Sequence, residues 1–196
     1  MSCPLVVLPR RAVPQPKPRI NSGGDCVACV LAGLVDTDVP AMYEMLKTPT
    51  GEGVTDIYRQ RDALNLLYYG GHLDRVVLDV PEWPVHDLCR SWGRPAWTLA
   101  LEWCHYTLMA LDAGYYGVGL VDYHKKGPFG DGTNHMVLIC GYREVSEESR
   151  IQQQILVSCS AAHPQGEWVE VRDYLKHWGG YYTRFARPCA ENTTPA

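Results

Sequence analysis

The sequence predicts an α+β fold in which helices come first and strands follow. Residues 25–69 carry apolar side chains at helical spacing between polar caps, whereas residues 73–187 contain short runs rich in Val, Ile, Leu, Tyr and Thr. The two kinds of signal do not alternate along the chain, as they would in a parallel-sheet protein. We therefore expect a helical part at about 25–71 and a mainly β part at about 72–188.

The first helix is expected to begin at Cys26, after an extended arm rich in Pro, Arg and Gly that covers residues 1–24. Asp25 is a good N-cap residue for it. The sequence CVACVLAGL is apolar on nearly every face, which predicts a buried helix.

Two more helices are expected before the strands begin. One opens at Asp38, with Pro in its first turn, and runs to about Leu46. The other is capped by Thr55 and ends at Gly70-Gly71.

Strand signals then take over, interrupted by two short helices near 85–92 and 171–178. The six predicted strands are 73–80, 96–103, 115–123, 135–142, 153–160 and 181–187. The tail 189–196 is expected to be frayed. One domain over 25–188 suits this length.

The composition narrows the function classes. The chain of 196 residues is 46% hydrophobic and 20% charged, with a net charge of -4, which gives no reason to expect nucleic acid or an anionic membrane as a partner. Its apolar runs are too short to cross a bilayer, and the order of a signal peptide is absent. We therefore expect a cytoplasmic protein with mostly free thiols, and leave open secretion as an effector without a signal peptide.

Cys26, His135 and the strand end at 158–160 follow one another in an order that suits thiol chemistry. A thiol at a helix N-terminus has its pKa lowered, because unpaired backbone N–H groups favour the thiolate. The Gly-rich loop GDGTN delivers His135 to the start of an apolar strand, where a neutral imidazole can take the thiol proton. A residue on the next strand would orient the ring.

Two stretches carry a resemblance to a known family. NHMVLICGY, followed by ILVSCSAAHPQGEW, resembles the histidine strand and the next strand of papain-like cysteine peptidases. DCVACVLAGL, with EGVTDIYRQRDAL after it, is similar to the bacteriocin-processing (double-glycine leader) branch of that superfamily. The resemblance spans roughly residues 20–187 and implies a papain-like fold with Cys26 as nucleophile and His135 as base.

The sequence departs from the family at the oxyanion-hole position and at the orienting position. Ile20 stands where the family has its oxyanion-hole glutamine, and Asn21 beside it is the candidate replacement. The family's orienting Asn or Asp aligns with Cys159, a poor acceptor for an imidazole N–H, so Ser158 and Ser160 are alternatives.

Cys29 competes with Cys26 as the nucleophile, because papain itself carries its nucleophile at the second cysteine of a C-x-x-C pair. We prefer Cys26 because the acidic Asp25 precedes it, as an acidic residue often does in the leader-peptidase branch. A pair of buried structural thiols is the third interpretation. The scattered His and Cys residues elsewhere do not repeat the close spacing of a zinc site, so no metal and no organic cofactor are expected.

Together these observations predict a cysteine peptidase-like thiol hydrolase that cleaves an amide bond of a peptide or protein substrate through a thioester. The alternatives are a catalytically inactive papain-like binding or structural domain, and an effector-type deamidase or acyltransferase that uses the same dyad. The substrate, the oligomeric state and the role of the arm (a strand, a cleft-covering propeptide or a docking tail) stay open.

Overall fold

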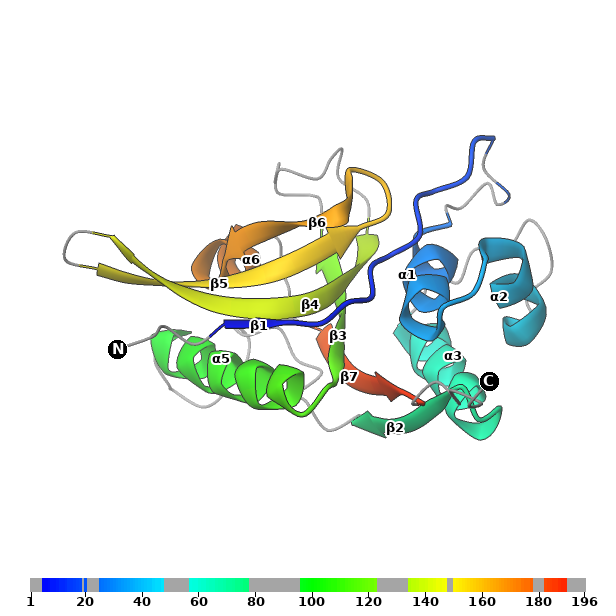
Figure 1. Cartoon of the computed structure of the whole chain (residues 1–196), viewed down its shortest axis with the longest axis horizontal. Coiled ribbons are helices and arrows are strands. Elements are labelled where there is room, and N and C mark those ends of the chain that lie inside the picture. Colours follow the sequence, from blue (N-terminus) through cyan, green and yellow to red (C-terminus); the bar gives the residue numbers. More distant parts are fainter. Residues whose placement is uncertain are drawn as a thin grey trace, which may run out of the picture.

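Figure 1 shows a computed structural model of the chain, which describes residues 5–18, 20, 25–47, 57–77, 96–122, 134–147, 150–177 and 182–189. Helices and an antiparallel sheet make up this part of the chain, which confirms the predicted α+β class.

Seven described strands form one sheet in the order β2-β7-β3-β4-β5-β6, with β1 beside β4. All strand pairs are antiparallel. The strands are β1 (Leu5–Val7), β2 (Leu73–Val77), β3 (Tyr116–Asp122), β4 (Asn134–Glu147), β5 (Arg150–Cys159), β6 (His163–Glu170) and β7 (Tyr182–Pro188).

Strand β4 is the centre of the sheet. Its first half pairs with β3, and β5 runs along its opposite edge. Strand β1 pairs with residues 141–143, beyond the end of β3, and so extends the edge that β3 leaves. The start of β4, which carries His135, pairs with β3, whereas the pairing of β4 with β5 begins only at Leu138.

Helices cover both faces of the sheet (Figure 1). On one face lie α1 (Cys26–Val35), α2 (Val39–Leu46) and α3 (Ile57–Tyr69), which share a buried cluster with Met136, Leu138 and Cys140 of β4. On the other face lie α5 (Ala96–Asp112) and α6 (Val171–His177), packed against Val137 and Ile139. The alternation of β4 side chains between two helical layers explains why this strand is apolar at successive positions.

Helices α1 and α2 begin where the sequence predicts, but only one of their two predicted N-caps forms a side-chain hydrogen bond. Asp38 caps α2 as predicted, its carboxylate accepting the Ala41 N–H at 2.7 Å. Asp25 precedes α1 as predicted, but its side chain makes no capping hydrogen bond. Thr55 and the helix predicted at 85–92 lie outside the described residues.

The strand predicted at 96–103 is wrong, because this segment begins helix α5. Its buried residues Trp103, Thr107 and Leu111 recur every four positions, which is a helical and not a strand spacing. Strands β1 and β6 were not predicted, since β1 falls in the Pro-rich arm and β6 begins with His-Pro-Gln-Gly.

The N-terminal arm, residues 5–18, packs along the sheet and then along α1 (Figure 1). The Ala12 N–H donates to Ser158 Oγ at 2.9 Å, and the Val13 N–H donates to the Cys29 carbonyl at 3.0 Å. A Cβ at Gly33 would lie 1.8 Å from the Arg11 carbonyl oxygen. Glycine at this position therefore allows the arm backbone to lie directly on the helix.

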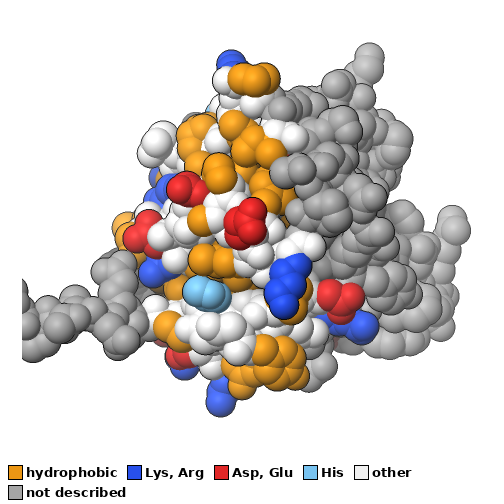
Figure 2. Space-filling model, turned by 90° about the vertical axis from the view of Figure 1, so that its right-hand side faces the viewer, with side chains coloured by type: hydrophobic (Ala, Val, Ile, Leu, Met, Phe, Trp, Pro, Cys, Tyr) orange, Lys and Arg blue, Asp and Glu red, His pale blue; other side chains and the backbone are white. Residues whose placement is uncertain are grey.

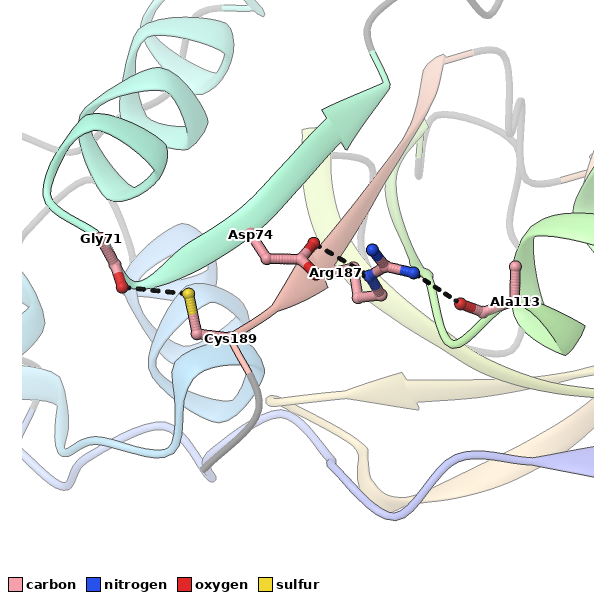
Figure 3. A network of polar contacts seen from close by, with 5 residues as sticks. All are labelled: Gly71, Asp74, Ala113, Arg187 and Cys189. Atoms are coloured by element: carbon pink, nitrogen blue, oxygen red, sulfur yellow. Dashed lines mark hydrogen bonds and ion pairs between the residues drawn. The ribbon is translucent and has the colours of Figure 1, made fainter. Parts of the chain in front are cut away.

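The far edge of the sheet is tied to the α5–β3 turn by Arg187 of β7 (Figure 3). Its Nε donates to both carboxylate oxygens of Asp74, at 2.9 and 2.8 Å, and its Nη1 donates to the Ala113 carbonyl at 3.4 Å. The Cys189 thiol donates to the Gly71 carbonyl at 3.1 Å, so the chain is held up to this residue. The remainder of the tail lies outside the described residues.

Figure 2 shows the side of the molecule that carries the N-terminal helices, with acidic, basic and apolar side chains interspersed. The exposed large apolar side chains of α3 are Leu66, Tyr68 and Tyr69. None of the described helices is long and apolar enough to cross a membrane alone. Helices α1 and α2 together have sufficient length and apolar composition, but they meet at a 98° bend.

Replacing Gly33 with alanine should detach the arm from α1. The added methyl group would overlap the Arg11 carbonyl, and backbone cannot move aside as a side chain can, so we expect a loss of about 3 kcal/mol in the free energy of unfolding. Urea denaturation measures this loss, and faster hydrogen exchange of the Val13 amide would localise it. Gly70→Ala is the control, because its Cβ would lie 3.0 Å from the Leu66 carbonyl oxygen and 3.1 Å from the movable His72 ring, with no overlap as close as that at Gly33. Equal losses in the two variants would contradict the prediction.

A second close approach lies at Gly119 of β3, where a Cβ would sit 2.2 Å from the Tyr174 hydroxyl oxygen. Gly119→Ala should cost about 2 kcal/mol in wild type and much less in a Tyr174→Phe background, since the phenylalanine removes the overlapping atom. A thermodynamic cycle of the four proteins by urea denaturation measures the coupling. Additive effects would show that the clash is relieved in another way.

Candidate active site

Helix α1 places Cys26 at its first position, where the thiol is half-buried beside strand β4. The sulfur accepts a hydrogen bond from the backbone N–H of Met136, the residue that follows His135. The backbone N–H groups of Cys26 and Val27, at the start of the helix, also face the sulfur. The thiol therefore lies against the first residues of β4.

His135, at the second position of β4, is 7% exposed. Its Nε2 lies 3.2 Å from Sγ of Cys159, the last residue of the neighbouring strand β5. The structure thus brings together two of the predicted site residues, His135 and Cys159. It gives the imidazole a thiol as neighbour at the position where the family resemblance puts an amide or a carboxylate.

Cys26 and His135 are close along β4 but are not hydrogen-bonded to each other in this structure. Cys26 packs against the core cluster on the α1 face, whereas Cys159 belongs to the cluster on the α5 face. His135 shares the face of Val137 and Ile139, because side chains alternate along a strand. The thiol and the imidazole therefore approach the start of β4 from opposite faces of the sheet.

The expected lowering of the Cys26 pKa is contradicted. Burial raises the pKa of the thiol above its ordinary value, and this is the largest effect. The backbone N–H groups that face the sulfur lower the pKa, as expected at a helix start, but they do not overcome burial. Cys159 raises the pKa further, since a second thiolate nearby would repel the first.

The two serines considered as orienting residues bind other groups. Ser158 Oγ donates to the Pro164 carbonyl at 2.7 Å and accepts the Ala12 N–H at 2.9 Å. Ser160 Oγ lies 3.5 Å from Gln15 Nε2 of the arm. In the described structure both serines join the arm to β5, and Cys159 alone of the three contacts His135.

Cys29, the alternative nucleophile, is fully buried one turn into α1. Its sulfur lies 3.9 Å from the Pro14 carbonyl, so the arm covers it. Burial, followed by the charge of Asp25, raises the pKa of this thiol to about 12. These surroundings are those of a structural thiol.

Two contacts of the site were not predicted. Asp25 Oδ1 accepts the Tyr43 hydroxyl at 2.6 Å, and Oδ2 accepts the Ile20 N–H at 3.1 Å. Neither has a sequence signal, because the first depends on how α2 packs against α1 and the second on where the preceding segment places Ile20. Asn21, the candidate oxyanion donor, lies outside the described residues.

A metal site is not formed by the described side chains, since no three of their His, Cys, Asp or Glu groups come together in a way that could hold an ion. His163 lies at the surface and pairs with Glu167 at 3.3 Å. The six described cysteines are free thiols.

The pH dependence of Cys26 alkylation tests the effect of burial. A raised pKa means that the thiolate fraction is still growing at pH 9, so the rate with iodoacetamide should keep rising through that pH. Peptide mass spectrometry can follow each thiol separately, with the half-exposed Cys189 as an internal control for reagent access. A plateau for Cys26 below pH 8 would show instead that the helix start lowers its pKa.

Comparisons of this chain with models of protein families, with curated proteins and with solved structures find no match.

Proposed function

We propose that the protein is a papain-like thiol hydrolase that cleaves an amide bond of a peptide or protein, with Cys26 as nucleophile and His135 as base. The observation that carries the proposal is the position of the Cys26 sulfur. It lies in the first turn of α1 and accepts a hydrogen bond from the N–H of Met136, the residue that follows His135. The contact between His135 and Cys159 supports it further, because it gives the imidazole a fixed neighbour on the adjacent strand.

The raised pKa of Cys26 favours attack by the thiol with concerted loss of its proton, in place of a preformed thiolate–imidazolium pair. As the sulfur–carbon bond forms, the thiol proton passes to the ring of His135. When the carbon–nitrogen bond breaks, His135 returns that proton to the leaving amine. Water then attacks the thioester, which releases the acid and restores the thiol.

The Cys26 backbone N–H lies at the free start of α1, where an amide is available to stabilise the oxyanion of the tetrahedral intermediate. We assign Asn21 as the second donor on the family resemblance. Cys159 would act as a positioning residue for His135, in the place of the family's Asn or Asp.

A catalytically inactive papain-like binding domain is the second candidate, and a specific observation favours it. Burial of Cys26 and the lack of a hydrogen bond between this thiol and His135 are what a non-catalytic pair would show. Deamidation or acyl transfer would use the same dyad with a different acceptor.

Acylation by p-nitrophenyl acetate separates the two candidates, because it requires a reactive nucleophile but no knowledge of the substrate. We expect a thioester on Cys26, found by peptide mass spectrometry, and a rate at least about 100-fold lower in His135→Ala, as for loss of a general base. Cys26→Ser should abolish the modification, whereas Cys29→Ser, which changes a covered thiol, should retain it. A folded wild type without acylation at Cys26 would overturn the enzyme proposal and favour the binding domain.

A further inference from the structure

Asp25 is a buried carboxylate that the proposed reaction does not use. The residue is 0% exposed and directly precedes Cys26. An N-cap aspartate ordinarily accepts an N–H from the first turn of its own helix, but the Asp25 side chain does not. A buried carboxylate needs strong donors, so its partners are expected to matter for the position of the helix start.

The donors come from two other parts of the chain. The Tyr43 hydroxyl, from α2, is 2.6 Å from Oδ1, which is the length of a hydrogen bond to a charged oxygen. The Ile20 N–H, from the segment before α1, is 3.1 Å from Oδ2. Tyr43 is 5% exposed, so water does not readily replace its hydroxyl.

These contacts fix Asp25, the N-cap residue of α1, in three directions. Tyr43 holds Asp25 to α2, Ile20 holds it to the preceding segment, and the Asp25 carbonyl accepts the Cys29 N–H at 2.8 Å within the helix. Because Cys26 is joined to Asp25 by a peptide bond, a shift of Asp25 moves the thiol away from the Met136 N–H.

We propose that Tyr43 is a positioning residue for Cys26, which acts through the Asp25 carboxylate to hold the thiol on the N–H of Met136. The consequence for catalysis rests on the proposed function, whereas the position of the thiol does not. Tyr43 contacts the Asp25 carboxylate, so its effect on the thiol passes through another residue.

The test compares Tyr43→Phe with Tyr116→Phe. Tyr116 is an equally buried tyrosine, 3% exposed, whose hydroxyl accepts the Arg10 N–H at 3.1 Å. Each variant loses one buried hydroxyl, so a general loss of stability should affect both alike. Two readouts are measured on the full chain: the rate of Cys26 acylation by p-nitrophenyl acetate, and the amide signal of Met136 in a ¹H–¹⁵N correlation spectrum.

We expect Tyr43→Phe to shift the Met136 amide signal and to slow acylation about 10- to 100-fold, the size of effect that follows from a small displacement of a reacting group. Tyr116→Phe should match wild type in both readouts. An unchanged Met136 signal and rate in Tyr43→Phe, or equal changes in the two variants, would overturn the inference.

The two proposals fail in different ways. If wild type is not acylated at Cys26, the proposed function falls, and the Met136 signal alone decides whether Tyr43 positions the thiol. Should Tyr43→Phe not fold, Asp25→Ala replaces it, because alanine removes the oxygen that accepts the Tyr43 hydroxyl. The same shift of the Met136 signal is then expected, and its absence would overturn the inference.

Discussion

Helix α1 has no polar face, and the rest of the structure depends on covering it on every side. Eight consecutive residues, Val27 to Leu34, are buried. Strand β4 covers one side of α1, and α2 and α3 pack in the same core cluster as this helix. The arm lies on the side where Gly33, which has no side chain, leaves room for its backbone. The arm therefore belongs to the core of the domain, because without it an apolar strip of the helix that carries Cys26 would face water.

The sheet decides how the site residues can meet. Cys26 belongs to the α1 layer, and His135 and Cys159 belong to the α5 layer, with β4 between them. This arrangement accounts for both the burial of the thiol and its contact with backbone in place of a ring nitrogen.

Sequence patterns predicted the elements whose periodicity is strong and local. They located α1, α2 and most strands. They failed where contacts between distant segments determine the secondary structure or the partner of a side chain. Residues 96–103 read as a strand because Leu and Trp suit both structures, and the four-residue spacing emerges only over the whole of α5. The roles of Ser158 and Tyr43 depend on partners from distant segments, so local pattern could not give them.

The position of the arm has a consequence for how the chain is made. Ala12 leaves the ribosome 146 residues ahead of its partner Ser158. At translation rates of about 5–20 residues per second, the arm waits roughly 7–30 s for the strand that holds it. Helix α1 emerges in that interval with the strip that the arm and β4 will cover still open. Apolar surface of the helix that carries Cys26 is therefore exposed to water during this part of synthesis.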